Sequence, residues 1–211
     1  MMRQFRHWKA RYIYHRTVRF YYEKSIESCP CLAIGAIKFL AVRLSDKDVC
    51  LEYGAGKSTL WFARLVGHLV SIESDRSWYE KVRRQISRHR NAEIFVFDGE
   101  EHCVPGTCVC WDYVNKMDEF TPETFTFILN DGYARLHVGL KALALLKPGG
   151  ILVWDDWANV FPMRTHIPKA LPANGVVKDE LLLEFWERVK NWHRVWYDDG
   201  THSTAIFFKP L

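Results

Sequence analysis

The stretch VCLEYGAGKST, residues 49–59, decides the fold. Its first five residues are apolar apart from Glu52, which is typical of a buried strand. Gly54 and Gly56 then allow a sharp backbone turn and a close approach to a ligand. Ser58 is a suitable cap for a helix that follows the turn. The stretch therefore predicts a strand, a tight glycine turn and a helix.

Strand and helix patterns alternate along the chain beyond this stretch. Units of this length predict a doubly wound α/β fold: a mostly parallel, Rossmann-like sheet with helices on both faces. A C-terminal antiparallel hairpin is expected to add to the sheet. Further strands are predicted at 69–73, 93–97, 125–129, 151–154, 193–197 and 203–209, helices at 58–66, 76–90, 134–146 and 179–190, and irregular loops at 98–124 and 157–176.

The first 44 residues predict a different kind of structure. A helix is expected at 3–27 because the segment contains no Gly or Pro. A second, more apolar helix is expected at 31–44, ended by Ser45 and Asp46. We therefore predict an N-terminal basic helical extension over 1–44 and the α/β domain over 45–211.

Composition limits the class of protein. The 211 residues are 48% hydrophobic and 26% charged, which is typical of a globular chain and excludes disorder over most of the length. No apolar run is long enough to cross a membrane, and no apolar signal core follows the basic N-terminus. We therefore expect a cytoplasmic protein whose six cysteines are reduced.

Positive charge is concentrated at the N-terminus. Residues 1–24 contain seven Lys or Arg and one acid, whereas the remainder contains 22 basic and 24 acidic residues. The nearly neutral body does not indicate nucleic-acid binding. For the extension we favour a helix whose aromatic side chains pack on the body while its bases face water. Peripheral contact with an anionic membrane through residues 1–24, or with an acidic substrate, RNA or protein partner, stays open.

The glycine turn has three interpretations. A triphosphate loop would need glycine where Leu51 stands, and a dinucleotide motif would need it at Thr59. Glu52 would also repel phosphates. S-adenosylmethionine carries no phosphate and has a cationic sulfonium, so it suits an acid here. Glu73, at the end of the second predicted strand, is at a position where carboxylates commonly bind a ribose diol.

Four segments together resemble the class I S-adenosylmethionine-dependent methyltransferases: VCLEYGAGKST, SIESD at 71–75, FVFDGE at 95–100 and LLKPGGILVWDD at 145–156. The resemblance covers roughly residues 48–156 and the closing hairpin. It implies that Glu52, Gly54 and Gly56 contact the methionine portion of the cofactor. It further implies that Glu73 binds the ribose and that Asp98 lies near the adenine. Ser58 is predicted to belong to the same cofactor site.

Three aspartates follow two further strands. Asp131 follows the fourth predicted strand, and Asp155 and Asp156 follow the fifth. Because neighbouring parallel strands end at one edge of a sheet, we expect these carboxylates to converge. Clustered carboxylates repel one another unless a cation binds between them, and Mg²⁺ prefers such oxygen ligands. The alternative is a structural role, in which the three aspartates cap loops and helix ends.

The pattern is similar to that of the metal-dependent O-methyltransferases of the catechol, caffeoyl and macrocin types. The resemblance implies Asp131, Asp155 and Asp156 as ligands of Mg²⁺, with Asp131 also serving as the general base. The Asp155-Asp156 pair is closer to the macrocin type, which acts on sugars. A histidine is the alternative base. His137 is our catalytic candidate, and His102, His166 and His202 are others near strand ends.

The sequence therefore predicts methyl transfer from S-adenosylmethionine to an oxygen of a small-molecule or sugar-like acceptor, with Mg²⁺ as a candidate aid. The stretch Asn130-Asp131-Gly132 lacks the prolines typical of enzymes that methylate amino groups of bases, so a nucleic-acid acceptor is not favoured. A noncatalytic scaffold and a nucleotide-dependent enzyme on a similar fold remain alternatives, and the oligomeric state is not predicted.

Overall fold

The computed structural model describes residues 10–97 and 111–211 of the chain. These residues form one seven-stranded sheet in the order β3-β2-β1-β4-β5-β7-β6. Strands β1 to β5 are parallel, and β7 lies antiparallel between β5 and β6. The predicted fold class is thus confirmed. The strands are β1 (Val49–Tyr53), β2 (His68–Glu73), β3 (Ala92–Val96), β4 (Phe125–Asn130), β5 (Leu146–Asp155), β6 (His193–Asp198) and β7 (Ser203–Phe208).

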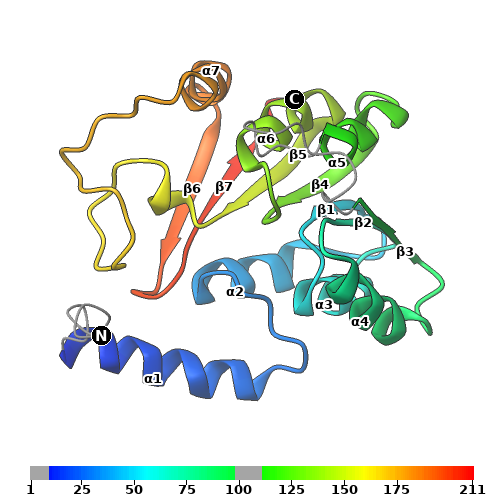
Figure 1. Cartoon of the computed structure of the whole chain (residues 1–211), viewed down its shortest axis with the longest axis horizontal. Coiled ribbons are helices and arrows are strands. Elements are labelled where there is room, and N and C mark those ends of the chain that lie inside the picture. The colour runs from blue at the N-terminus through cyan, green and yellow to red at the C-terminus, as the bar shows by residue number, and fades with distance from the viewer. Residues whose placement is uncertain (1–9, 98–110) are drawn as a thin grey trace.

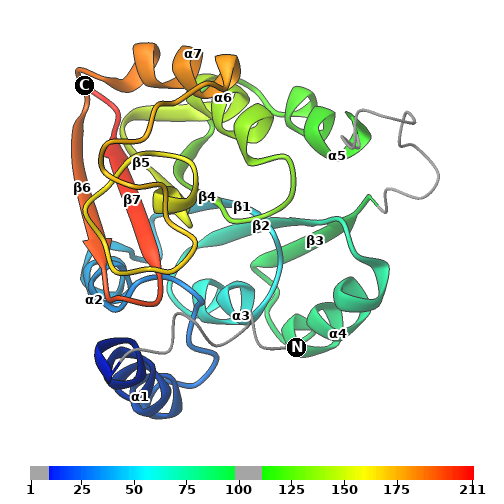
Figure 2. The same cartoon turned by 60° about the vertical axis from the view of Figure 1, so that its left-hand side comes forward.

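Helices cover both faces of the sheet (Figures 1 and 2). The helices are α1 (Ala10–Ser25), α2 (Ile34–Arg43), α3 (Lys57–Ala63), α4 (Arg76–Ile86), α5 (Trp111–Asn115), α6 (Arg135–Leu145) and α7 (Glu180–Val189), and two short 3-10 turns are η1 (Lys116–Glu119) and η2 (Trp157–Asn159). Figure 2 shows α5, α6 and α7 on one side of the sheet and α1 to α4 on the other.

The core has one layer on each side of the sheet. On one side, Trp154 of β5 packs against Phe185 of α7, with ring centroids 4.8 Å apart. On the other, Phe62 of α3 packs against Phe127 of β4, and Leu40 of α2 is fully buried in the same cluster. Burial on both faces explains why the central strands are nearly continuous apolar runs.

The register of the central strands places their ends side by side. Tyr53 of β1 is paired with Ile72 of β2 and with Asn130 of β4, and Asn130 is paired in turn with Trp154 of β5. The next residues along these strands therefore emerge at one edge of the sheet. They include Gly54, Glu73, Asp131 and Asp155.

Two elements differ from the sequence prediction. Residues 111–119, expected to be irregular, form α5 and η1 because Tyr113, Val114 and Met117 bury their side chains against the core. Strand β5 begins at Leu146, which pairs with Phe125, and the register then shifts before Ile151. Residues 147–150, which lie between the predicted helix at 134–146 and the predicted strand at 151–154, are thus an irregular part of β5. Predictions for residues 1–9 and 98–110 lie outside the described residues.

Helix α1 packs only in part as we favoured: Tyr22 contacts the core, and Arg11, Arg16 and Lys24 are exposed. Its fully buried side chain is a base, Arg19, whereas Tyr14, Phe20 and Tyr21 are exposed. Helix α2 behaves as predicted for a core helix, with Ala36, Ile37 and Leu40 buried. The expectation that the aromatic residues of α1 would pack on the body was therefore wrong for these three residues.

Candidate active site

Gly54 brings the ends of β1 and β4 into backbone contact. Its φ is +96°, a conformation that favours glycine. Its N–H donates to the carbonyl of Ile72 at 2.9 Å. A Cβ added at Gly54 would lie 2.7 Å from both the N and the Cα of Gly132. A side chain at this position would therefore push the two turns apart.

Glu52 stabilises the glycine turn from the buried interior of the domain. Its side chain is fully buried, and its Oε2 accepts hydrogen bonds of 2.6 Å from Thr59 Oγ1 and from Ser71 Oγ. Thr59 Oγ1 in turn accepts a 2.8 Å bond from the N–H of Gly56. Burial raises the pKa of Glu52 to about 7, although the surrounding hydroxyls oppose the rise. Glu52 is not among the residues that line the two cavities below, so it supports the turn from within the core.

The first cavity, of about 430 Å³, lies above the ends of β1, β2 and β4. We call it the cofactor cavity. It brings together five of the residues that the sequence predicted: Gly54, Gly56, Ser58, Glu73 and Asp131. Its other lining residues are Cys31, Ala55, Lys57, Ser74, Trp78, Gly132 and Tyr133. Asp98 lies outside the described residues.

Glu73 is held rigidly at the wall of the cofactor cavity. Its Oε1 accepts hydrogen bonds from the N–H groups of Ser74 at 2.7 Å and Asp75 at 2.8 Å. Burial raises the pKa of Glu73, and these donors oppose the rise. Trp78 stands nearby on α4, with its indole N–H donating to the carbonyl of Ala55 at 2.6 Å. We did not predict Trp78; an aromatic in the first turn after Glu73 was the available signal.

The three predicted aspartates converge, but they surround the guanidinium of Arg135 and not a metal ion. Arg135 of α6 donates from Nη2 to Asp131 Oδ1 at 2.7 Å and from Nη1 to Asp156 Oδ2 at 3.3 Å. The same Nη1 donates to the backbone carbonyl of Asp155 at 3.3 Å. Over residues 10–97 and 111–211, no group of three His, Cys, Asp or Glu side chains is arranged to hold a metal ion. Arg135, four residues after Asp131, is the partner that the sequence analysis missed.

The carboxyls of Asp155 and Asp131 are both buried, and burial raises the pKa of each. Asp155 is 3% exposed, and its Oδ1 accepts a 3.0 Å hydrogen bond from Thr204 Oγ1. Burial raises the pKa of Asp155, and the charges of Asp131 and Asp156 raise it further. Burial also raises the pKa of Asp131 to about 6, against the guanidinium of Arg135.

A second cavity, of about 520 Å³, adjoins the aspartates. We call it the acceptor cavity. It receives Tyr12 from α1, residues 167–169 from the proline-rich loop, and Thr201 and His202 from the turn between β6 and β7. Asp131 and Cys31 line both cavities, so the two meet at these residues. The remaining lining residues are Asp155, Asp156 and Asn159.

His202, rather than His137, is the histidine brought to the acceptor cavity. Burial lowers the pKa of His202, and the charge of Arg19 lowers it further. The imidazole is therefore largely neutral near pH 7 and can accept a proton. His137 instead packs edge-on against Trp111, with ring centroids 5.0 Å apart. His166 is exposed on the proline-rich loop and lines neither cavity.

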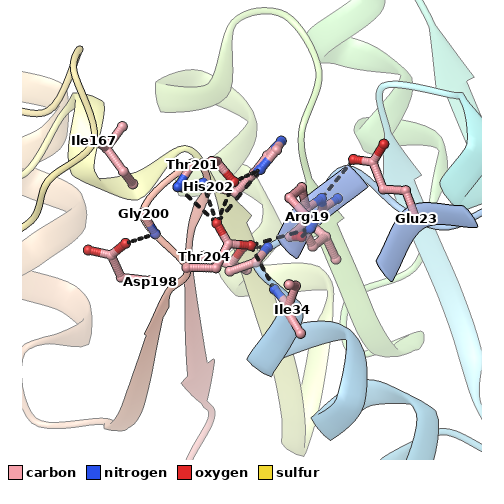
Figure 3. Close-up of polar contacts among 12 residues, drawn as sticks. Arg19, Glu23, Ile34, Ile167, Asp198, Gly200, Thr201, His202 and Thr204 are labelled. Carbon is pink, nitrogen blue, oxygen red and sulfur yellow. Dashed lines mark hydrogen bonds and ion pairs between the residues drawn. The ribbon is translucent and has the colours of Figure 1, made fainter. Parts of the chain in front are cut away.

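Asp199 holds the turn that presents Thr201 and His202. Figure 3 labels Thr201 and His202 on this turn. Asp199 Oδ1 accepts from the backbone N–H groups of Thr201 at 2.9 Å and His202 at 2.8 Å. Its Oδ2 accepts from the N–H of Ile34 at 3.1 Å and from Arg19 at 3.4 Å. Burial acts to raise the pKa of Asp199, but these donors outweigh it and leave the pKa below its usual value. The turn is thus fastened to both N-terminal helices.

Comparisons with known proteins identify the fold. No family model matches the sequence, and no curated protein matches it. Solved structures do match. An rRNA methylase from Streptococcus thermophilus is 14% identical, with a TM-score of 0.52 over 82% of this chain and 93% of that chain. A Streptococcus mutans protein described as a methyltransferase, in complex with SAH, is 13% identical, with a TM-score of 0.53 over 82% and 94%.

A third match is the N-methyltransferase NodS from Bradyrhizobium japonicum, which is 15% identical, with a TM-score of 0.50 over 84% of this chain and 94% of that chain. At these identities the likeness concerns the fold alone. The chain thus has the fold of the methyltransferases that bind S-adenosylmethionine, as its sequence predicted. In the described residues, no helix is long and apolar enough to cross a membrane.

Proposed function

We propose that this protein transfers a methyl group from S-adenosylmethionine to a hydroxyl oxygen of a small polar, sugar-like acceptor. The observation that carries the proposal is the junction of two cavities at Asp131. The lining of one cavity includes glycine backbone, Glu73 and Trp78. The polar lining of the other consists of carboxylates, an amide, the hydroxyls of a tyrosine and a threonine, a lysine and a histidine. A donor and an acceptor held in these cavities would meet at Asp131, and positioning of this kind supplies much of the rate in methyl transfer.

The cofactor cavity suits a cation-bearing nucleoside better than a polyphosphate. Glu73 and Asp131 contribute two carboxylates, and Lys57 contributes one ammonium group. In this proposal Glu73, which the N–H groups of Ser74 and Asp75 hold at the cavity wall, accepts hydrogen bonds from the ribose diol. The rings of Trp78 and Tyr133, which line the same cavity, stack on the adenine. When bound, the cofactor supplies an electrophilic methyl group. Asp98 as an adenine contact, Glu52, Gly54 and Gly56 as contacts of the methionine portion, and Ser58 as a further residue of the cofactor site remain predictions.

Asp131 is our choice for the group that accepts the proton of the acceptor hydroxyl. It lines both cavities, and with a pKa of about 6 it is mostly ionised near pH 7. Arg135 fixes its orientation through the 2.7 Å bond to Oδ1. Neutral His202 and Asn159 supply further polar contacts in the acceptor cavity. Such a wall suits a hydroxyl-rich acceptor because each carboxylate or amide oxygen can accept a hydrogen bond from it.

Magnesium does not fit the residues present. The guanidinium of Arg135 already bridges Asp131 and Asp156, which is where the predicted ion would bind. Asp155 is buried and accepts a hydrogen bond from Thr204. We therefore assign the proton transfer to side chains. SAH binding, and methyl transfer to any acceptor found, are expected to be unchanged by excess EDTA. Loss of turnover with EDTA and its return with Mg²⁺ would contradict this assignment.

Calorimetric titration with SAH tests the cofactor site. The wild-type protein is expected to bind SAH and to show no heat with ATP or NAD. Glu73→Gln is expected to weaken SAH binding by about tenfold or more, since it removes one charged acceptor for the ribose diol. Glu80→Gln, the same change on the adjoining helix α4, is the matched control and should bind as wild type. Tight ATP binding without SAH binding would instead favour a nucleotide-dependent enzyme.

Turnover is tested by SAH formation with a panel of catechols, monosaccharides and glycosides. Asp131→Asn is expected to abolish acceptor-dependent SAH formation. SAH binding is measured in parallel because Asp131 also lines the cofactor cavity, and it should persist because Glu73 and the glycine turn are untouched. If the wild-type protein binds SAH tightly but turns over no acceptor, the noncatalytic scaffold is favoured.

A further inference from the structure

Helix α1 buries a base against the body and leaves most of its large apolar side chains exposed. Tyr12, Arg19 and Tyr22 lie on the inner side, where Tyr12 lines the acceptor cavity, Arg19 is buried and Tyr22 contacts the core. Five large hydrophobic side chains, which we call the stripe, are exposed on the same helix. They are Ile13, Tyr14, Val18, Phe20 and Tyr21, each between 42% and 67% exposed. An ordinary surface helix instead buries most of its large apolar side chains.

Arg19 explains why the helix does not rotate the stripe inward. The guanidinium donates to the carbonyls of Pro30, at 2.8 Å, and Leu32, and it forms ion pairs with Glu23 at 2.7 Å and Asp199 at 3.4 Å (Figure 3). Rotation would leave these buried acceptors without a donor, which is costly. The exposed stripe is therefore a fixed feature of the fold. Contiguous exposed apolar surface of this kind usually marks an interaction site.

Basic side chains accompany the stripe. Arg11, Arg16 and Lys24 are exposed on the same helix, and Lys24 Nζ lies 4.3 Å from the centroid of the Phe20 ring. The one acid among residues 1–24, Glu23, is paired with Arg19. Exposed aromatic and aliphatic side chains combined with unopposed bases are typical of helices that lie in the interface of an anionic membrane.

We propose that α1 docks this protein on an anionic lipid surface, with the stripe entering the headgroup region. Charge argues against a second copy of the chain, because a symmetric contact would press two strongly basic helices together. RNA would engage the bases, but phosphate contacts leave Ile13 and Val18 in water. An anionic lipid surface can bind the bases through its headgroups and also bury the apolar side chains. This inference is independent of the proposed methyl transfer.

Vesicle co-sedimentation of the full-length protein tests the proposal. The protein is expected to sediment with vesicles of two parts phosphatidylcholine and one part phosphatidylglycerol, but not with phosphatidylcholine alone. The stripe variant Tyr14→Ser/Phe20→Ser and the charge variant Arg11→Glu/Arg16→Glu should each lower the vesicle affinity by at least about tenfold. All four side chains are exposed, so the thermal midpoint should be unchanged.

The matched control is Arg83→Glu/Arg84→Glu on α4, which makes the same change in net charge at another exposed helix. It should bind the anionic vesicles within about twofold of wild type, well inside the loss expected for the α1 variants. Equal loss in this control would mean that net charge alone drives binding, and would overturn the proposal. The proposal would also be overturned if the stripe variant bound the anionic vesicles as tightly as the wild-type protein does. If light scattering shows a dimer that dissociates in the stripe variant, the proposal is overturned in favour of self-association. Binding of single-stranded RNA without vesicle binding would overturn it in favour of a nucleic-acid partner.

Discussion

At the residue scale, Gly54 makes the sharpest prediction. Its φ of +96° is strained for any residue with a Cβ, and the added atom would meet the backbone of Gly132 at 2.7 Å. Gly54→Ala is therefore expected to lower the free energy of unfolding by roughly 2 kcal/mol or more. Urea unfolding followed by tryptophan fluorescence measures the change.

Gly56 provides the control within the same turn. Its backbone is extended, and an added Cβ would approach no atom closer than 3.7 Å, at Trp78 Nε1. Gly56→Ala should cost less than about 1 kcal/mol. Equal destabilisation by the two substitutions would show that the β1 and β4 turns are not in contact.

Glu52 predicts a dependence of stability on pH. Burial raises its pKa from 4.5 to about 7, so the folded state holds the proton more tightly than the unfolded chain. The resulting stability is fully present below about pH 4.5 and is lost as pH rises through about 7. The loss amounts to about 3 kcal/mol for this shift.

Glu52→Gln should remove this contribution because glutamine carries no charge to desolvate. The free energy of unfolding of the variant should fall less between about pH 5 and pH 8 than that of wild type. Asp131 and Asp155 also have raised pKa values, so some slope will remain. An unchanged slope would mean that Glu52 ionises normally in the fold. Parallel urea titrations at the two pH values decide between these results.

Sequence reasoning located residues by their place after strands, and it was weaker on their partners. Gly54, Glu73 and Asp131 meet in one cavity because parallel strands end at one edge. The interpretation of the aspartates as magnesium ligands missed Arg135. The strand pattern fixes where carboxylates emerge, but it does not reveal which helix side chain folds back between them.

At the element scale, α1 depends on one buried side chain. Arg19→Met keeps most of the apolar stem but leaves the carbonyls of Pro30 and Leu32 unpaired and Asp199 without its cation. We expect a loss of about 3 kcal/mol in the free energy of unfolding. Chemical denaturation measures it.

Arg16→Met, on the exposed side of the same helix, is the matched control for Arg19→Met. It should change the free energy of unfolding by less than about 0.5 kcal/mol. Similar values for the two substitutions would mean that the buried network contributes nothing to stability.

The elements that the sequence predicted best are those with strong local signals. Strand β1 was predicted with its exact bounds, because five residues of strand pattern end at a glycine turn. Helix α5 and the early start of β5 were missed, since both depend on tertiary contacts. Tyr113 packs on Tyr53, 60 positions earlier in the chain, with ring centroids 5.0 Å apart. No local window contains such a contact.

At the scale of the whole molecule, α2 is built into the core of the α/β domain. Leu40 and Ile37 share a cluster with Phe127 and Ile206, and the N–H of Ala33 donates to Thr204 Oγ1 at 2.9 Å. We therefore expect residues 34–43 to unfold together with the sheet. Native-state hydrogen exchange should give the amides of α2 the same opening free energy as those of β4. Exchange of α2 well before β4 would support a separate N-terminal unit.

The ion pair between Arg19 and Asp199 joins positions 180 residues apart in the chain. During synthesis, the first helix must therefore wait until almost the whole chain has left the ribosome before its buried base finds its acid. Tyr12 and His202, on opposite sides of this pair in sequence, face the acceptor cavity only after that closure. A nascent chain stalled before the last hairpin would contain every residue that lines the cofactor cavity but would lack Thr201 and His202 of the acceptor cavity.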